Sequence, residues 1–247
     1  MTLKDFLGKY EHIAIAFSGG VDSSYLLCCA MRYCDDVTAY YAQTPFQPRF
    51  ERTDAERVAK FLGAKLKIIT YNILNDDVIA ANTPQRCYFC KRKMFGLICA
   101  QAQKDGYETV ADGTNASDKF SERPGMKALA ENGILSPLRE CGITKDYVRT
   151  MSKDEKLFTW DKPAYSCLAT RIPHGTRIEE QTLFRIEMAE NEIHALGFSD
   201  FRVRLSEGAP RFQIKEGEFT AAAKYKNELS AIFKRYFNAA YLNPEVR

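Results

Sequence analysis

The stretch Ile13–Ser23, IAIAFSGGVDS, decides the fold of this chain. Its apolar start, Ile13–Phe17, is typical of a buried strand. The small residues that follow allow a sharp turn into a helix over roughly Asp22–Tyr33. Because glycine carries no side chain, the backbone N–H groups around Gly19 and Gly20 can approach an anion closely, and the positive end of the helix points at the same place. The stretch therefore predicts a turn that binds phosphate groups.

Polar side chains complete this predicted turn. Ser18 and Ser23 supply hydroxyl donors, and Asp22 could hold a magnesium ion beside the phosphates. The turn contains no lysine, which excludes the GxxxxGK[ST] loop of the phosphoryl-transferring nucleoside triphosphatases. The string SGGVDS at 18–23 instead resembles the SGGxDS PP-loop of the ATP pyrophosphatase superfamily. Members of that superfamily bind ATP, adenylate a substrate oxygen and release pyrophosphate. The residues that the resemblance assigns to ATP here are Ser18, Gly19, Gly20, Asp22 and Ser23.

Strand and helix patterns alternate along the first half of the chain. The strand patterns cover Ile13–Phe17, Val37–Ala42, Lys65–Thr70 and Glu108–Ala111, and the helical patterns cover Asp22–Tyr33, Phe50–Leu62 and Arg86–Lys104. This alternation predicts βαβ units and an α/β fold, with a parallel sheet that carries helices on both faces. Ligands of such sheets bind beyond the carboxyl ends of the strands, which is where the SGGVDS turn is expected.

The pattern changes in the last third of the chain. A long amphipathic helix is expected over Glu179–Leu196 and is ended by Gly197. Two strands, Phe201–Leu205 and Arg211–Ile214, and a helix over about 218–233 follow it. We therefore expect two domains, a PP-loop domain over residues 1–160 and a small C-terminal α+β unit over 161–247.

Composition narrows the class of protein. The chain has 247 residues, of which 45% are hydrophobic and 27% are charged, and it contains no apolar segment of membrane-spanning length. Its first residues carry charges throughout and lack the apolar core of a signal peptide, so we expect a cytoplasmic protein with no membrane association. The net charge of +3 is too small to demand nucleic acid and fits an anionic small molecule.

The chain has eight cysteines and no export signal, which argues against a disulfide framework. Two of them, Cys87 and Cys90, form a CxxC within RCYFCK. Their basic neighbours favour thiolates, which are the form that binds metals or undergoes redox chemistry. A structural zinc site would need a second such pair. The remaining cysteines apart from Cys167 are expected to be structural: Cys28, Cys29, Cys34, Cys99 and Cys141.

A third thiol of interest is Cys167, in SCLATRIP at 166–173. Three cysteines can hold three irons of a 4Fe-4S cluster and leave the fourth iron open. Free cysteine is also a common buried residue, so the sequence pattern alone leaves a structural role for Cys167 equally open.

The chain as a whole resembles the LarE family, the ATP-dependent sulfur transferases of nickel-pincer nucleotide synthesis, whose product is the cofactor of lactate racemase. The matching strings span most of the length in the expected order. They are SGGVDS at 18–23, RCYFCK at 86–91, DGTNASD at 112–118, RPGMKAL at 123–129, SPLRE at 136–140, CLATRIP at 167–173 and RVR at 202–204.

This resemblance implies a specific reaction. ATP adenylates a carboxylate of pyridinium-3,5-biscarboxylic acid mononucleotide, and sulfur then replaces AMP to give a thiocarboxylate. In some members a single cysteine matching Cys167 is the sacrificial sulfur donor. In others an additional CxxC is thought to hold a 4Fe-4S cluster that delivers sulfide. Because Cys87, Cys90 and Cys167 are all present, we expect the cluster type, and the sacrificial route stays open.

The resemblance also assigns substrate contacts. Arg202 and Arg204 alternate on a strand and so share one face, where they would bind the substrate's phosphate. A solvated basic edge strand is the equally open structural interpretation. Glu190 matches an acidic position near substrate or metal. Residues of the polar loop after the fourth strand are expected near the nucleotide: Asp112, Thr114 and Asn115, with Asp118 and Arg123 as weaker candidates.

Other functions stay open at this point. A tRNA-thiolating PP-loop enzyme would need a nucleic-acid footprint, which the weak net charge does not supply. An amidating ligase would need an ammonia source, and a nucleotide-sensing module would bind ATP without releasing pyrophosphate. For the sulfur transferase, the resemblance implies a homo-oligomer and hand-off of the product to a nickel-inserting protein.

Overall fold

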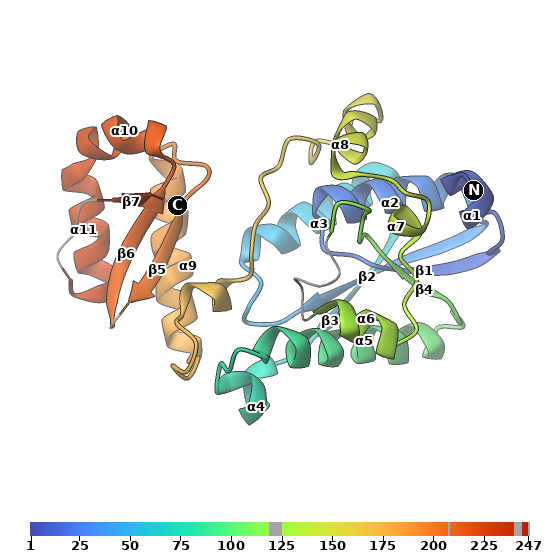
Figure 1. Ribbon diagram of the computed structural model, residues 1–247, viewed down its shortest axis with the longest axis horizontal. Helices are drawn as coiled ribbons and strands as arrows, with labels where there is room; N and C mark the ends of the chain where they lie inside the picture. Colours follow the sequence, from blue (N-terminus) through green and yellow to red (C-terminus); the bar gives the residue numbers. More distant parts are fainter. Residues whose placement is uncertain (119–124, 207, 240–243, 247) are drawn as a thin grey trace. The chain divides into compact units, whose positions relative to one another are not determined.

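The computed structural model describes residues 1–118, 125–206, 208–239 and 244–246 (Figure 1). Arg123, one of the weaker candidates above, lies outside these residues. The chain forms two compact units. The first comprises residues 1–73 and 85–164, and the second comprises residues 74–84 and 165–247.

The first unit is built on a four-stranded sheet with the order β3-β2-β1-β4. All three strand pairings are parallel. The strands are β1 (His12–Ala16), β2 (Asp36–Gln43), β3 (Lys65–Thr70) and β4 (Val110–Asp112). The predicted parallel α/β sheet is therefore confirmed, and each strand lies close to its expected position.

Helices cover both faces of this sheet (Figure 1). Those of the first unit are α1 (Leu3–Leu7), α2 (Val21–Tyr33), α3 (Arg49–Leu62), α5 (Arg86–Lys104), α6 (Gly125–Glu131), α7 (Pro137–Glu140) and α8 (Lys145–Asp154). Helix α8 begins after a threonine cap, because Thr144 Oγ1 accepts a hydrogen bond from the backbone N–H of Tyr147.

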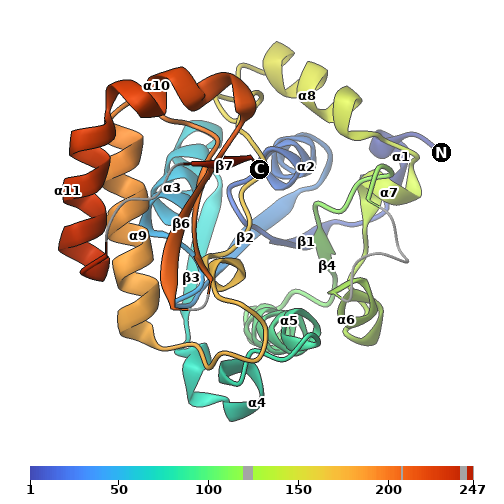
Figure 2. The same ribbon diagram turned by 60° about the vertical axis from the view of Figure 1, so that its left-hand side comes forward.

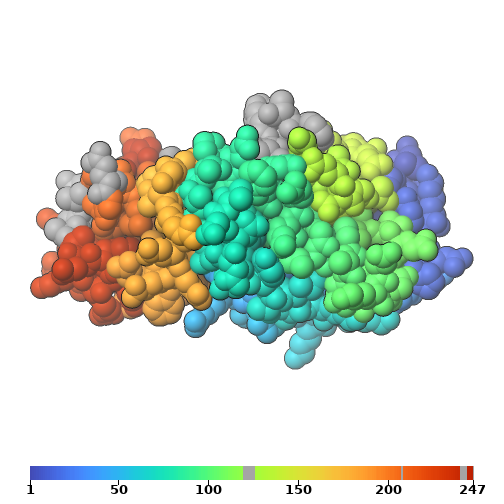
Figure 3. Space-filling view, turned by 90° about the horizontal axis from the view of Figure 1, so that it is seen from below, coloured from blue at the N-terminus to red at the C-terminus, as the bar shows by residue number. Residues whose placement is uncertain are grey.

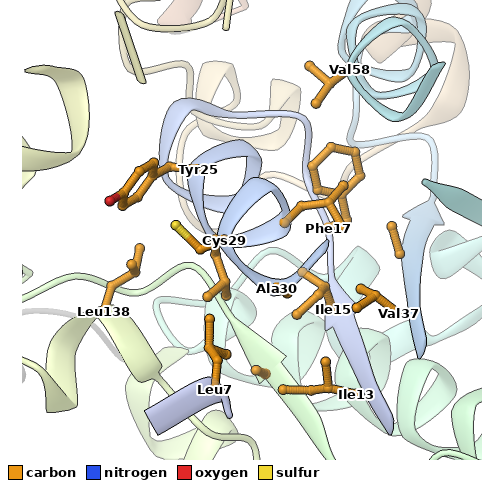
Figure 4. Packing of buried hydrophobic residues seen from close by; sticks show 14 of the residues in the cluster. Leu7, Ile13, Ile15, Phe17, Tyr25, Cys29, Ala30, Val37, Val58 and Leu138 are labelled. Carbon is orange, nitrogen blue, oxygen red and sulfur yellow. The ribbon is translucent and has the colours of Figure 1, made fainter. Parts of the chain in front are cut away.

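Side chains of β1 alternate between the two faces. Ile13 and Ile15 lie in one buried cluster with α2 and α3, and Figure 4 shows them beside Phe17, Cys29 and Ala30. The alanines between them belong to a second cluster with α5 and α6. Figure 3 looks onto this second side, where α5 and α6 pack side by side. The central strand is thus buried on both faces, which explains its continuous apolar pattern.

The second unit has a small mixed sheet. Its strands are β5 (Arg202–Ser206), β6 (Ala209–Ile214) and β7 (Glu245–Val246), with β5–β6 antiparallel and β6–β7 parallel. Its helices are α4 (Asp77–Ala80), α9 (Glu180–Ala195), α10 (Phe219–Lys224) and α11 (Lys226–Phe237). Helices α9 and α11 lie together on one face of β5 and β6 (Figure 2), over an aromatic core. The predicted C-terminal α+β unit is confirmed.

One expected element differs from the structure. The sequence predicts a single helix over about 218–233, whereas the chain bends at Tyr225 between α10 and α11. Tyr225 packs edge-on against Phe198, with the ring centroids 6.1 Å apart. Ala222 from α10 and Leu229 from α11 enter the same core, one on each side of this bend.

Residues 74–84 belong to the second unit, and the side chain of Asn82 is one of the groups that attach them there. Asn82 is fully buried and adopts a left-handed conformation with φ of 55°. Its Nδ2 donates hydrogen bonds to the carbonyl oxygens of Ile172, Pro173 and Thr176, at 3.3, 2.8 and 3.1 Å. No motif in the sequence indicates this attachment.

Among the described residues, no helix is both long enough and apolar enough to cross a membrane.

Candidate functional site

The predicted phosphate turn lies at the carboxyl end of β1 and leads directly into α2. Ser18 and Ser23 face each other across it, with their Oγ atoms 3.0 Å apart. Gly20 is the N-cap of α2 and supplies no side-chain acceptor, so the helix start presents backbone N–H groups without a side-chain cap. This is the arrangement in which a helix N-terminus binds an anion.

Two glycines allow this turn to pack tightly. Gly19 has φ of 70°, and a Cβ atom there would lie 2.9 Å from the backbone nitrogen of Ala55 in α3. At Gly113, after β4, a Cβ atom would lie 2.7 Å from the backbone nitrogen of Ser23. Real Cβ atoms do not approach that closely, so both positions require glycine. The sequence analysis identified Gly19 but not Gly113, although DGT directly after a strand is a signal for such a close approach.

Asp22 is held from two directions. Asn115 Nδ2 donates to Asp22 Oδ1 at 3.2 Å, and Lys145 Nζ donates to Asp22 Oδ2 at 2.6 Å. Lys145 is the first residue of α8 and is partly exposed, as is Asp22. The sequence analysis missed Lys145, because 122 intervening residues separate it from Asp22 and only the fold brings them together. The turn that lacks its own lysine thus has one beside it.

The polar loop after β4 is closed by its own hydrogen bonds. Asn115, which is buried, accepts a hydrogen bond from the backbone N–H of Ser117 at 2.8 Å. Its own backbone N–H donates to Asp118 Oδ2 at 3.1 Å. Asp112 is buried and accepts hydrogen bonds from the hydroxyls of Thr114 and Ser136. Burial raises the pKa of Asp112, and these hydroxyl donors oppose that rise. Of the predicted nucleotide contacts in this loop, Asn115 reaches the phosphate turn through Asp22, and Thr114 is bonded to Asp112.

The CxxC pair lies on the first turn of α5 in the first unit. Cys87 is exposed, whereas Cys90 is buried with its Sγ 3.6 Å from Met94 Sδ. Cys167 belongs to the second unit and is half-buried. Both cysteine segments follow directly after points where the chain passes from one unit to the other. Among the described residues, no group of three or more His, Cys, Asp or Glu side chains is arranged to hold a metal ion.

Three other cysteines differ from these in their surroundings. Cys28 and Cys29 on α2 are buried, as the sequence predicts. Burial raises the pKa of the Cys29 thiol to about 12, so it is protonated at neutral pH and is a poor nucleophile. Burial likewise raises the pKa of Cys34 to about 11. The reactive thiols must therefore be sought among the more accessible cysteines.

The second unit contains a cluster of buried charges near Cys167. Glu190 on α9 forms an ion pair with Arg171, with Oε1 and Nε 2.9 Å apart. Arg202 on β5 is 3% exposed, and burial lowers its pKa, as does the neighbouring guanidinium of Arg171. The ring of Tyr165 lies against both guanidiniums, with distances from ring centroid to Cζ of 4.6 and 4.9 Å. Two cations thus lie close to one carboxylate, which favours a bound anion.

Arg204 is exposed on the same strand, two residues beyond Arg202. Its charge also lowers the pKa of Arg202, so the two predicted phosphate residues lie near each other. One is buried and anchored, and the other is accessible. Glu190 lies beside them, and in this structure its carboxylate oxygens already accept hydrogen bonds from the protein itself.

The fold therefore divides the candidate residues into two groups. Six candidates of the first unit lie at the phosphate turn, namely Ser18, Gly19, Gly20, Asp22, Ser23 and Asn115, while Thr114 lies after β4 and Cys87 and Cys90 lie on α5. In the second unit, the segment that carries Cys167 and the strand that carries Arg202 and Arg204 are both bonded to Glu190.

Comparisons with known proteins identify the family of the chain. A family model described as the tRNA methyl transferase HUP domain matches residues 11–132. A relative from Lactiplantibacillus plantarum, named pyridinium-3,5-bisthiocarboxylic acid mononucleotide synthase, is 32% identical over 217 residues, which are 87% of this chain and 79% of that protein. The chain belongs to this family, the LarE family.

Two further comparisons extend the finding. An uncharacterised protein of Synechocystis is 35% identical to the chain described here, over 86% of this chain and 80% of the relative. The structure of an NMN synthetase from Francisella tularensis superposes with a TM-score of 0.53 and covers 66% of this chain and 72% of that one. Its sequence identity is 19%, so this likeness concerns the fold alone.

The close approach at Gly113 gives a first prediction. Gly113→Ala places a methyl group against the Ser23 backbone, so we expect a loss of about 1–3 kcal/mol in the free energy of unfolding and weaker ATP binding. Denaturant unfolding and titration calorimetry measure the two effects. Gly96→Ala, inside α5 where a Cβ atom meets nothing closer than 3.7 Å, is the control and should not destabilise. Equal stability of the two variants would contradict the prediction.

The ion pair between Lys145 and Asp22 gives a second prediction. A cation at this place can bind ATP phosphates, so Lys145→Met should weaken ATP–magnesium binding about tenfold, as expected for the loss of one charge-assisted contact. Titration calorimetry measures the affinity. Lys153→Met, on the same helix but with its Nζ over the ring of Trp160, should leave the affinity unchanged. Full ATP affinity in Lys145→Met would show that Lys145 only neutralises Asp22.

Proposed function

We propose that this protein is an ATP-dependent sulfur transferase that acts on pyridinium-3,5-biscarboxylic acid mononucleotide. The observation that carries the proposal is the match to the L. plantarum synthase over 87% of the chain, a length that includes both units. A carboxylate is a poor electrophile, so it must be activated before sulfur can enter. Adenylation does this, because AMP is a good leaving group.

The first unit supports the activating half of the reaction. We propose that the phosphates of ATP lie on the backbone N–H groups at Gly19 and Gly20, with the hydroxyls of Ser18 and Ser23 as further donors. Asp22 has the carboxylate chemistry that magnesium prefers. One of its oxygens is bonded to Lys145, and we propose that this amine moves away when magnesium binds, because the two cations repel each other. The freed amine would then be available to the phosphates.

The second unit supports the sulfur half. Arg204 is accessible and Arg202 is anchored beside it, so we propose that they bind the phosphate of the pyridinium mononucleotide. We place Cys167 at the reaction centre. We further propose that Cys87, Cys90 and Cys167 ligate a 4Fe-4S cluster, which would supply sulfide and spare the protein's own thiol. The accessible thiol of Cys87 and the basic residues that follow Cys90 support this part of the proposal.

Product formation tests the proposed function. Protein purified without oxygen is incubated with ATP, magnesium and pyridinium-3,5-biscarboxylic acid mononucleotide. We expect pyrophosphate release that depends on this substrate, together with a thiocarboxylate product detected by mass spectrometry. ATP binding without pyrophosphate release would instead indicate a sensing module.

The fate of the thiols separates the two sulfur routes. With a cluster, iron and sulfide are present in the active protein and the intact mass of the chain is unchanged after turnover. If Cys167 is the sulfur donor, the chain loses about 34 Da as the thiol departs as hydrogen sulfide. A metal-free protein that is fully active would exclude the cluster.

A relative from Thermotoga petrophila named tRNA-specific 2-thiouridylase, 27% identical over 47% of this chain, favours a second candidate, tRNA thiolation. The basic strand of the second unit could contact an RNA backbone in place of a nucleotide phosphate. Filter binding of tRNA at moderate salt distinguishes the two, because the proposed small-molecule enzyme should not retain tRNA.

The arginine pair gives a further prediction. Arg204→Gln should raise the KM for the mononucleotide about tenfold or more, because a charge-assisted contact to phosphate is lost, and should leave the KM for ATP unchanged. Arg211→Gln is the control, since Arg211 lies directly opposite on β6 and is 3.7 Å from Glu245. Equal effects of both variants would indicate a general positive field, and loss of ATP binding would place Arg204 in the other site.

We propose that the chain forms a homo-oligomer and passes its product to a nickel-inserting protein. Its membership of the LarE family supports both proposals.

A further inference from the structure

Glu190 joins three segments of the second unit through one carboxylate. It is 6% exposed and accepts four hydrogen bonds. Oε1 accepts from Arg171 Nε at 2.9 Å and from the backbone N–H of Val203 at 2.8 Å. Oε2 accepts from Arg171 Nη2 at 3.1 Å and from the hydroxyl of Tyr165 at 2.6 Å. The strand that carries Arg202 and the segment that carries Cys167 are thus bonded to the same group.

Arg171 continues this connection to the backbone around Cys167. Its side chain is fully buried, and the Nη1 atom donates to the carbonyl oxygen of Ser166 at 2.8 Å and to Thr170 Oγ1 at 3.0 Å. Thr170 Oγ1 in turn donates to the carbonyl oxygen of Cys167 at 2.8 Å. The peptide groups on both sides of the cysteine are therefore held by one guanidinium and one hydroxyl, together with the backbone N–H of Thr170, which donates to the carbonyl oxygen of Cys167 at 3.0 Å.

The chemistry of the arginine suits this task. Its fork of donors can bind a carboxylate on one side while a remaining N–H group reaches backbone carbonyls on the other. A lysine ammonium, which is a point charge, cannot do both in a fixed geometry. Burial makes the arrangement stiff, because breaking the pair would leave an uncompensated charge in the interior.

We propose that Arg171 is a positioning residue, which holds the turn at Cys167 in fixed register with the strand that carries Arg202 and Arg204. Glu190 binds the guanidinium of Arg171, and Thr170 connects that guanidinium to the carbonyl oxygen of Cys167. The expected effect on turnover rests on the sulfur-transferase function proposed above, whereas the positioning of the Cys167 turn does not. Sulfur transfer needs the thiol, or the group it ligates, at a set distance from the bound substrate, and an error of about 1 Å can cost about a hundredfold in rate.

Labelling of the thiols tests the positioning directly. Whole protein is treated with chelator and reductant so that its thiols are free, and iodoacetamide labelling at Cys167 is followed by peptide mass spectrometry. Labelling of Cys87 in the same molecules is the internal reference. We expect Thr170→Val to raise the ratio of the two rates about fivefold, which corresponds to the loss of one hydrogen bond. Arg171→Gln should raise it further.

Arg235→Gln is the matched control. Arg235 pairs with Glu192, two residues after Glu190 on α9, at 2.6 Å, and this pair is exposed and touches neither the Cys167 turn nor β5 in the contacts described. Its labelling ratio should match that of the native protein. In turnover, Thr170→Val should lower kcat about tenfold while the KM for the mononucleotide stays within about twofold, because the substrate arginines are intact.

The outcomes separate the two proposals. If Thr170→Val keeps the native labelling ratio, the positioning role is wrong whatever the reaction is. If Arg171→Gln does not fold, as its melting curve would show, Thr170→Val alone decides. If the native protein makes no thiocarboxylate while the labelling ratios change as expected, the proposed function fails and the positioning role stands. Equal changes in Arg235→Gln would overturn the role by showing a general loosening of the second unit.

Discussion

The parallel pairing of β1 with both β2 and β4 is the constraint on which the first unit depends. It places the carboxyl ends of the three strands at one edge of the sheet, with Ala16 in register with both Tyr40 and Asp112. The phosphate turn after β1 then has little room, since α3 approaches at Gly19 and the loop after β4 approaches at Gly113. Close packing on both sides fixes the backbone N–H groups before any ligand arrives. A preformed site of this kind saves the entropy of ordering the turn on binding.

The second unit depends on a different interaction, the buried ion pair of Arg171 and Glu190. Its charges are largely removed from water, so they must be satisfied by each other and by nearby hydrogen-bonding groups. The groups that satisfy them are the backbone at Cys167 and the strand at Val203, and this is why elements of unrelated local sequence meet there. In the function proposed above, both units offer polar groups to anions, one through backbone N–H groups and the other through arginines.

Local signals predicted most of the fold. The apolar runs and the alternation of strand and helix arise from interactions between near neighbours, and the structure confirms them. Other features arise between distant residues and had no local signal. Asn82 attaches residues 74–84 to the second unit by bonding to carbonyls about ninety residues away, and the bend at Tyr225 depends on the ring of Phe198. Lys145 beside Asp22 is of the same kind.

The sequence by itself determined the phosphate turn, the class of fold, the family and the residue types available for chemistry, because each of these is encoded in short strings or in their order. Only the tertiary structure decided which of these residues are accessible and which are already bonded to protein groups. It gave Arg202 a buried place and Arg204 an exposed one on the same strand. In the folded chain, Asp22 is bonded to Lys145, and the carboxylate of Glu190 accepts hydrogen bonds from donors of the protein itself. Burial and hydrogen-bond partners depend on the packing of distant segments, and no single segment of sequence specifies them.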